Sequence, residues 1–276
     1  MRAPNSDWIL ATDLDGTLLD RSYNLEEAAT ALNDLLDRWT GVRHLVLATS
    51  KTLDELLPFS AMIDRLPVLI FENGAGYAVP SIDQTGAAVY ATSTEGPGYS
   101  AIRDTLVRLR TDYQLSFTGF GDMSDAQLSG ITGLSRKDAR RAKNRHASEP
   151  LLWADSPQRL AQFRDDLAKE QLELVRGGQF LHVSSAVNKW NAIQRWRKQV
   201  ASSSRLLACG DAPNDLLMLS HADQAIVFPD ANGNYLLNPS ATLCHANSCG
   251  VVGWREAVEN ALAEHCPEIP LQSTTV

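Results

Sequence analysis

The fold of this chain is decided where an apolar run meets acidic residues, in the stretch Trp8-Ile9-Leu10-Ala11-Thr12-Asp13-Leu14-Asp15-Gly16-Thr17. The run Trp8–Thr12 predicts a buried strand, and Gly16 predicts a sharp turn after it. The carboxyl ends of parallel strands are where open α/β sheets bind ligands. One carboxylate placed there can attack as a nucleophile while the other donates a proton, and both can hold a hard cation. An ordinary strand followed by an acidic turn is the alternative for these residues taken alone.

Strand and helix signals alternate from this point on. An amphipathic helix is expected over Leu25–Trp39, with Asn24 as its cap. The strand His44–Ala48, a helix from about Leu53 and the strand Val68–Phe71 follow. This alternation predicts an α/β fold with a doubly wound parallel sheet.

The middle of the chain has a different pattern of secondary structure, in which short strands mix with helices. The segments expected there are Ala87–Ala91, Ser100–Tyr113, Asp125–Gly130, Ser135–Arg145, Leu151–Trp153, Pro157–Lys169, Leu172–Val175 and Phe180–Val183. The first pattern then returns, with the helix Lys189–Val200 and the strands Arg205–Cys209 and Ala225–Phe228. We therefore expect a core made of residues 1–84 and 186–276, interrupted by an inserted α+β cap over residues 85–185. The expected linkers lie near Ser81–Gly86 and Ser184–Asn188.

Four polar junctions follow the expected core strands. They are Asp13/Asp15, Thr49–Thr52, Glu72–Gly76 and Gly210–Asp215. Parallel topology brings the carboxyl ends of these strands to one edge of the sheet, so the junctions should meet there. The four aspartates Asp13, Asp15, Asp211 and Asp215 would repel one another unless a cation lay among them. A magnesium ion and one lysine would relieve that repulsion.

Composition and charge exclude several classes of protein. The 276 residues are 44% hydrophobic and 21% charged, which is ordinary for a soluble protein, and no apolar run approaches the length of a membrane span. The first residues lack the apolar core of a signal peptide, so a cytoplasmic location is expected. The four cysteines have no paired spacing, which argues against a zinc site or a disulfide framework. A net charge of −8 argues against general nucleic-acid binding. The basic segment Arg136–His146 is either a solvated helix face or a rim that attracts an anionic substrate.

Two motifs resemble those of the haloacid dehalogenase superfamily. Asp13-Leu14-Asp15-Gly16-Thr17 resembles its nucleophile motif, and Gly210-Asp211-Ala212-Pro213-Asn214-Asp215 resembles its metal motif. Most members are magnesium-dependent phosphatases, so the resemblance implies that Asp13 is the nucleophile and Asp15 the general acid and base. It further implies that magnesium is held by Asp13, Asp211 and the carbonyl of Asp15, with Asn214 and Asp215 as partial or supporting ligands. The implied phosphate-binding residues are Thr49, Ser50 and Lys189, where Lys189 opens the helix that returns from the insert.

The size and position of the insert resemble the large α+β cap of the Cof-like branch. The usual T-G-R after the second strand is here Thr49-Ser50-Lys51, a departure that resembles the mannosyl-3-phosphoglycerate phosphatases. The resemblance continues in segments of both domains. These are Phe71–Gly74, Gly119–Ser124, Thr132–Leu134, Ala142–Lys143, Ser148–Pro150 and Arg176–His182.

The family resemblance implies a small-molecule substrate, a glycosyl phosphoglycerate, and a place in the biosynthesis of the compatible solute mannosylglycerate. No nucleic-acid or membrane partner is expected, and the oligomeric state stays open. Arg176 could pair with the substrate carboxylate, Asp122 or Glu149 could accept sugar hydroxyls, and glycine-rich turns could offer backbone amides. The full set of expected substrate-binding residues is Lys51, Asn73, Gly121, Asp122, Met123, Ser148, Glu149, Arg176, Gly177 and Gly178.

Several alternatives stay open. The sugar could be mannose or glucose. Another Cof-like sugar phosphatase, for example one for sucrose phosphate, and a phosphomutase of the same fold would both use the same core residues. A binding or regulatory protein that works through the basic segment, with a vestigial site, is the alternative from a different class.

Overall fold

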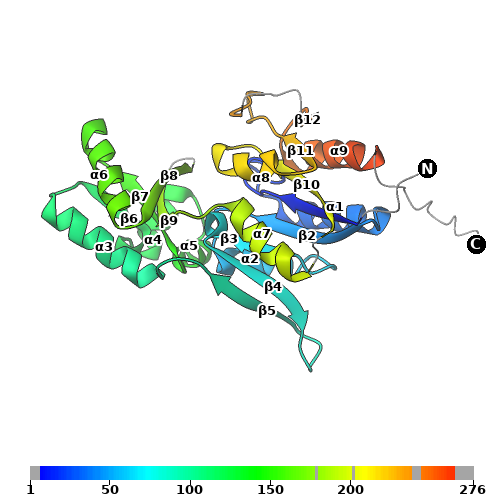
Figure 1. The fold of residues 1–276 in the computed structure, drawn as a ribbon, viewed down its shortest axis with the longest axis horizontal. Coiled ribbons are helices and arrows are strands. Elements are labelled where there is room, and N and C mark those ends of the chain that lie inside the picture. The colour runs from blue at the N-terminus through cyan, green and yellow to red at the C-terminus, as the bar shows by residue number, and fades with distance from the viewer. Residues whose placement is uncertain (1–6, 178–179, 201–202, 238–243, 265–276) are drawn as a thin grey trace, which may run out of the picture.

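The structure is a computed structural model that describes residues 7–177, 180–200, 203–237 and 244–264. It consists of a large core and a smaller cap (Figure 1). The core is built on an eight-stranded sheet with the order β12-β11-β10-β1-β2-β3-β4-β5. Its strands are β1 (Trp8–Thr12), β2 (Val42–Ala48), β3 (Val68–Phe71), β4 (Gly76–Ile82), β5 (Ala88–Thr94), β10 (Arg205–Gly210), β11 (Gln224–Val227) and β12 (Cys244–His245). The strands from β12 to β3 are parallel, and β3, β4 and β5 pair antiparallel.

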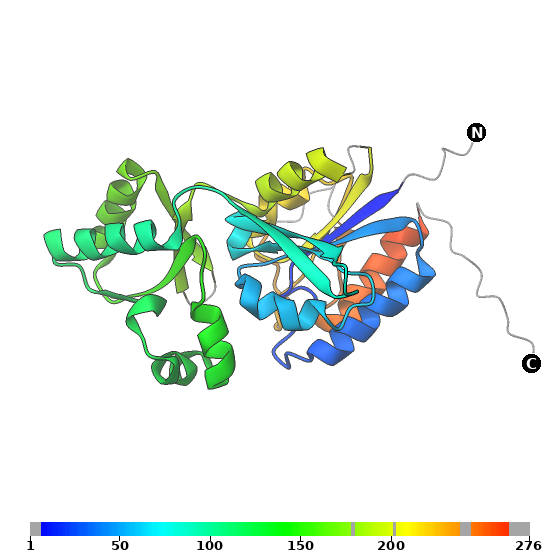
Figure 2. The same cartoon turned by 90° about the horizontal axis from the view of Figure 1, so that it is seen from below.

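Helices cover both faces of this sheet (Figure 2). The helices α1 (Leu25–Arg38), α2 (Leu53–Ser60) and α9 (Gly250–Ala263) pack on one face, in a cluster that includes Leu10 and Leu207. The helices α7 (Lys189–Val200) and α8 (Leu216–Ser220) pack on the other, against Ile9 and Leu206. Successive residues of a strand point to opposite faces, so the continuous apolar run of β1 feeds both clusters. The predicted doubly wound α/β core is confirmed, on a sheet that is mixed and mostly parallel.

The cap has a separate antiparallel sheet with the order β6-β7-β9-β8. Its strands are β6 (Phe117–Gly119), β7 (Ser148–Trp153), β8 (Leu172–Gly177) and β9 (Phe180–Ser185), and its helices are α3 (Tyr99–Asp112), α4 (Asp125–Thr132), α5 (Arg136–Lys143) and α6 (Pro157–Lys169). One face packs against α3 and α6, in a cluster that includes Leu106, Leu151 and Phe163. A second cluster joins α4 and α5 to Phe120 and Phe180. The insert therefore has the expected α+β architecture.

One strand assigned to the insert lies in the core instead. The segment expected as a cap strand at Ala87–Ala91 falls in β5, which pairs with β4 along the edge of the large sheet. The expected linker Ser81–Gly86 includes the turn of this hairpin, in which the Asp83 amide donates a hydrogen bond to the Ala87 carbonyl. The chain therefore passes into the cap only after Thr94. The alternating strand pattern of this hairpin is the same in either sheet, so the sequence did not distinguish the two placements.

Within the described ranges, no helix has the length and apolar character needed to cross a membrane. The basic segment forms α5, where Arg140 and Lys143 pair with Asp125 on α4. Arg136 and Lys137 are exposed. Much of this basic charge is thus either paired within the cap or solvated.

Candidate active site

The acidic motifs meet at the carboxyl edge of the core sheet. Strands β1 and β10 pair in parallel, and the Asp13 amide donates to the Cys209 carbonyl at 3.0 Å, so Asp13 lies beside Asp211. Gly16 has φ +84°, and a Cβ there would lie 2.4 Å from an oxygen of Asp211. The D-x-D-G-T motif thus needs glycine both for the turn and for the close approach of the second acidic motif.

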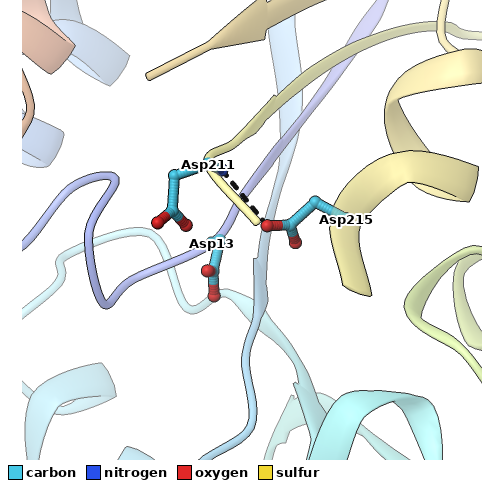
Figure 3. A group of neighbouring side chains, drawn as sticks. All are labelled: Asp13, Asp211 and Asp215. Carbon is cyan, nitrogen blue, oxygen red and sulfur yellow. Dashed lines mark hydrogen bonds between the residues drawn. The ribbon is translucent and has the colours of Figure 1, made fainter. Parts of the chain in front are cut away.

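Three carboxylates converge at this edge (Figure 3). Asp13, Asp211 and Asp215 can each place one oxygen so that all three oxygens lie within 4.8 Å of one another. Asp13 is 5% exposed and Asp215 is fully buried. One oxygen of Asp215 accepts the backbone amides of Asp211 at 3.2 Å and Ala212 at 3.1 Å, which fixes the turn that carries Asp211.

Lys189 provides the positive charge within this group. Its side chain is fully buried, and Nζ lies 2.9 Å from Asp13 Oδ1 and 2.6 Å from Asp215 Oδ1. Burial alone would lower the pKa of this ammonium, but Asp13 and Asp215 outweigh burial and raise it, so Lys189 is charged. The lysine comes from the first turn of α7, the helix that returns from the cap, as the sequence predicted.

One lysine does not balance the three carboxylates. Burial, and then repulsion from neighbouring carboxylates, raises the pKa of Asp13 well above its usual range even though Lys189 lowers it. Burial and Asp215 raise the pKa of Asp211 to about 7. Both shifts follow from burial and from the repulsion among neighbouring carboxylates, which an added cation would relieve. Carboxylate oxygens are the donors that Mg²⁺ prefers, so this group fits a divalent hard cation.

Asp15 lies outside this three-carboxylate group and has its own partners. Its Oδ2 is 3.0 Å from Lys51 Nζ, and its Oδ1 accepts a short hydrogen bond from the Tyr23 hydroxyl. Lys51 also donates to the Tyr23 hydroxyl at 2.8 Å. Burial and the Asp15 carboxylate raise the pKa of Tyr23, so this hydroxyl keeps its proton and acts as a donor.

The loop after β2 supplies the expected phosphate-binding residues. Thr49 is buried, its amide donates to the Ile70 carbonyl, and its Oγ1 accepts the Lys51 amide at 3.3 Å. The Ser50 carbonyl accepts a hydrogen bond from Arg145 of the cap at 3.4 Å. The loop therefore lies between Asp15 and the cap.

The junction after β3 links the core to the cap. Glu72 is 1% exposed, and its carboxylate accepts the amides of His146 and Ala147 and the Ser148 hydroxyl. Next to it, Asn73 accepts a hydrogen bond from Asn214 at 3.0 Å. Two expected site residues, Asn73 and Asn214, are thus brought together, and Ser148 is held against the core.

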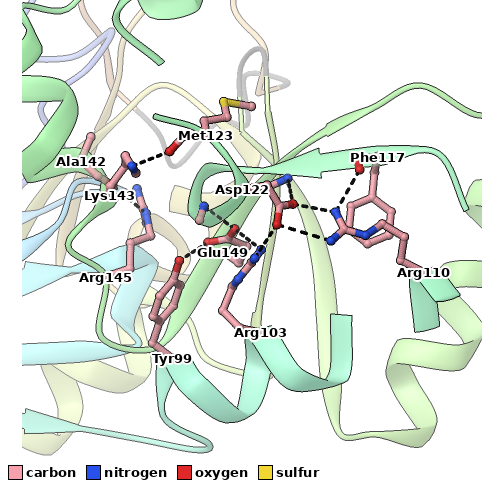
Figure 4. Close-up of polar contacts among 12 residues, drawn as sticks. Tyr99, Arg103, Arg110, Phe117, Asp122, Met123, Ala142, Lys143, Arg145 and Glu149 are labelled. Carbon is pink, nitrogen blue, oxygen red and sulfur yellow. Dashed lines mark hydrogen bonds and ion pairs between the residues drawn. The ribbon is translucent and has the colours of Figure 1, made fainter. Parts of the chain in front are cut away.

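Other expected substrate residues form a network inside the cap (Figure 4). Glu149 accepts the Tyr99 hydroxyl, Arg103 and the Gly121 amide at 2.9, 2.9 and 2.8 Å. Asp122 accepts Arg103, Arg110 and the Gly119 amide. Burial alone would raise the pKa of Asp122, but the two arginines outweigh it and lower the pKa. Met123 is buried, and its carbonyl accepts a hydrogen bond from Lys143. The carboxylates of this network are already satisfied by the cap itself.

The pleat of the cap sheet places two expected substrate residues on the face covered by α3 and α6. Arg176 pairs with Leu181 across β8 and β9, and Glu149 pairs with Val183 across β7 and β9. Leu181 and Val183 both pack in the cluster under α3 and α6, and directly paired residues share a face. Arg176 is exposed and has no hydrogen bond or ion pair to any residue within the described ranges. Gly177 ends β8, and Gly178 lies outside the described residues.

The residues that the sequence analysis missed are the partners of those it found. Tyr23, Glu72 and Arg103 were not selected, and Arg145 was noted only as part of the basic segment, because each acts on a residue distant in the sequence or across a turn. The motif Glu72-Asn73-Gly74 was noted as a junction, which was the only available signal for Glu72. Tyr23 lies in a polar turn, and no sequence signal pointed to it.

Comparison with known proteins agrees with this architecture. Residues 133–253 match the model of a family described as haloacid dehalogenase-like hydrolase. This segment includes Lys189, Asp211, Asn214 and Asp215, and ends before α9 does.

Solved structures extend the similarity over both domains. A Thermoplasma acidophilum protein aligns with a TM-score of 0.64 and 13% identity, over 94% of this chain and 98% of that one. A haloacid dehalogenase superfamily phosphatase from Bacteroides thetaiotaomicron aligns with a TM-score of 0.62 and 17% identity, over 96% and 97%. A subclass IIB sugar phosphatase of the superfamily aligns with a TM-score of 0.55 and 14% identity, over 93% and 98%. The chain has the haloacid dehalogenase-type fold with a cap, and the narrower expectation of a mannosyl-3-phosphoglycerate phosphatase stays a prediction.

Proposed function

We propose that this protein is a magnesium-dependent phosphatase that acts on a phosphorylated sugar derivative. The observation that carries the proposal is the group of Asp13, Asp211 and Asp215 around the buried ammonium of Lys189. This group fits a metal-assisted phosphoryl transfer, in which a carboxylate nucleophile needs cations around the transferring phosphoryl group.

The proposed reaction runs in two steps. An oxygen of Asp13 attacks phosphorus, the bond from phosphorus to the ester oxygen breaks, and Asp15 gives its proton to the leaving alkoxide. Water then attacks the aspartyl-phosphate, Asp15 takes the proton from that water, and inorganic phosphate leaves. Lys189 and the hydroxyl of Thr49 hold phosphate oxygens, with Ser50 beside them.

Magnesium would be held by the carboxylates of Asp13 and Asp211 and the carbonyl of Asp15, with Asp215 and Asn214 supporting them. The ion would supply a Lewis acid that neutralises charge on the transferring oxygens. Asp215 already orients the Asp211 turn through two amide hydrogen bonds, which suits a supporting role.

For the substrate we propose mannosyl-3-phosphoglycerate or its glucosyl analogue, which would yield the glycosylglycerate and phosphate. The support is the family resemblance of Thr49-Ser50-Lys51 and of the cap segments, together with the ammonium of Lys51 beside Asp15. Lys51 is the favoured partner of the glyceric carboxylate, and Arg176 is the alternative. Asn73 and Ser148 are the remaining candidates for substrate contact at the junction of core and cap.

We also propose that the cap is the segment between the end of β5 and the start of α7, which is a shorter insert than residues 85–185.

Phosphate release from a panel of esters tests this proposal. The panel contains both glycosyl-3-phosphoglycerates, sucrose phosphate, trehalose 6-phosphate, glucose 6-phosphate and p-nitrophenyl phosphate, each with magnesium and with chelator. Preference for a glycosyl-3-phosphoglycerate supports the substrate proposal. Preference for a sugar phosphate without a carboxylate refutes it and favours another sugar phosphatase, as the similarity to a subclass IIB sugar phosphatase would suggest. Isomerisation that depends on a bisphosphate and releases no phosphate would indicate a phosphomutase.

A further inference from the structure

Asp15 belongs to a closed ring of three polar contacts that the reaction outlined above does not explain. The Tyr23 hydroxyl donates to Asp15 Oδ1, Lys51 lies 3.0 Å from Asp15 Oδ2, and Lys51 donates to the Tyr23 hydroxyl at 2.8 Å. The Lys51 ammonium also lies 4.6 Å from the centre of the Tyr23 ring. Both oxygens of the Asp15 carboxylate are therefore engaged.

The backbone holds Tyr23 in this place at a conformational cost. Tyr23 has φ +53°, a left-handed conformation that is unusual for a bulky side chain. The turn before it imposes this conformation, since the Tyr23 amide donates to the Asp20 carbonyl and Asp20 Oδ1 accepts the Ser22 amide and hydroxyl at 2.8 and 2.5 Å. Backbone strain of this kind concentrates at functional sites, where the surrounding structure maintains it.

The two aspartates of the D-x-D motif differ in the contacts that hold their side chains in place. Asp13 is buried and paired with Lys189, whereas the Asp15 side chain is 36% exposed. An exposed carboxylate can adopt several rotamers, so it needs contacts that select one of them. The ring of contacts provides this selection for Asp15.

We infer that Tyr23 is a positioning residue, whose hydroxyl holds the Asp15 carboxylate in the orientation for proton transfer. This inference rests on the proposed function, in which Asp15 is the general acid and base. Lys51 is also proposed to contact the substrate carboxylate, so it cannot serve Asp15 alone. Tyr23 holds Oδ1 throughout. When Lys51 turns from Oδ2 to the substrate carboxylate, Oδ2 is left to give the proton to the leaving alkoxide and to take it from the attacking water.

The variant Tyr23→Phe removes the hydroxyl and keeps the ring. With the best alkyl ester of the panel, kcat should fall about tenfold to hundredfold with KM little changed, because misplacing a catalytic group costs about that much. In kcat/KM, which reports the steps up to formation of the aspartyl-phosphate, the loss should be smaller with p-nitrophenyl phosphate, since nitrophenolate leaves without a proton. Tyr235→Phe is the matched control, because the Tyr235 hydroxyl also donates a hydrogen bond, to the Ala246 carbonyl at 2.7 Å, and belongs to neither acidic motif.

Two further variants separate this role from a structural one. Tyr23→Asn lacks the hydroxyl but tolerates the left-handed backbone, so it should fold and should show the same loss. In the Asp15→Asn background, Tyr23→Phe should have no further effect, because a positioning residue acts only through the group that it positions.

Equal losses of kcat/KM on both esters, an undiminished loss in the Asp15→Asn background, or full activity of Tyr23→Phe would each overturn the inference. A wild-type protein that releases phosphate from no ester would instead refute the proposed function itself, so the two failures are distinguishable.

Discussion

Carboxylates cluster in two regions of this molecule, and the two clusters differ in charge balance. At the edge of the core sheet, Asp13, Asp211 and Asp215 face the single ammonium of Lys189. In the cap, Asp122 and Glu149 face the guanidinium groups of Arg103 and Arg110, with the Tyr99 hydroxyl and backbone amides as further donors. The core cluster has an excess of negative charge, whereas the cap cluster is balanced.

The pKa directions show the same contrast for Asp122 but not for the buried Glu149. In the core cluster, burial and neighbouring carboxylates raise the pKa of both Asp13 and Asp211. In the cap, the arginines lower the pKa of Asp122, while burial raises that of Glu149 despite its donors. Unbalanced carboxylates mark a site that needs a ligand cation, and balanced ones stabilise a fold. We therefore interpret the core cluster as the reaction site and the cap cluster as a brace.

The largest effect should come from the core cluster. Asp13→Asn preserves the shape of the side chain but removes the proposed nucleophile, so we expect kcat to fall roughly 10⁴–10⁶-fold, as for other nucleophile deletions. Phosphate release measures the loss, and Asp112→Asn, at a side chain that is 55% exposed, is the matched control. Near-normal turnover by Asp13→Asn would mean that the unbalanced cluster does not mark the nucleophile.

Removal of metal should also act on the core cluster. A chelator should abolish activity and magnesium should restore it, while magnesium at about 100 times its Kd should stabilise the fold by about 2.7 kcal/mol. Thermal unfolding with and without magnesium measures this shift. Asp211→Asn should reduce it, whereas Asp125→Asn, whose carboxylate is paired with Arg140 and Lys143, should leave it unchanged. Full activity of a rigorously metal-free sample would refute the metal site.

The proposed carboxylate contact gives an intermediate effect. Lys51→Met keeps the apolar stem and removes the charge, and we expect kcat/KM for a glycosyl-3-phosphoglycerate to fall about tenfold to hundredfold, the worth of a charge-assisted contact of roughly 1.5–3 kcal/mol. The same variant should lose less with p-nitrophenyl phosphate, which has no carboxylate. Arg176→Ala should have little effect, because Arg176 lies on the face covered by α3 and α6. A substrate-specific loss in Arg176→Ala and none in Lys51→Met would reverse this assignment.

The smallest effect on catalysis should come from the cap brace. Glu149→Gln keeps the shape of the side chain but weakens its hydrogen bonds with Arg103, Tyr99 and Gly121. We therefore expect the free energy of unfolding, measured with denaturant, to fall by about 1.5–3 kcal/mol while the substrate preference stays unchanged. The control variant Glu170→Gln loses an exposed ion pair with Arg108, and it should lower the free energy of unfolding by less than about 1 kcal/mol. A changed substrate preference without loss of stability would return Glu149 to the substrate-binding role that the sequence suggested.

The α/β core and the acidic residues at its edge could be predicted from sequence patterns alone. The apolar run of β1, the turn at Gly16 and the second motif at Gly210–Asp215 are local patterns, and parallel topology leaves only one edge at which they can meet. Lys189 followed from its place in the first turn of the helix that leaves the insert. These predictions needed no knowledge of contacts between distant side chains.

The partner of each polar side chain depends on contacts between distant parts of the fold. The pleat and register of the cap sheet turned Glu149 and Arg176 toward α3 and α6, and a shift of one residue in register would have turned both away. The hairpin of β4 and β5 could belong to either sheet until strand pairing placed it in the core. Tyr23 reaches Asp15 because a left-handed turn directs it there, and Glu72 meets the segment 146–148 across the fold. Such partners depend on long-range geometry, which composition and periodicity do not encode.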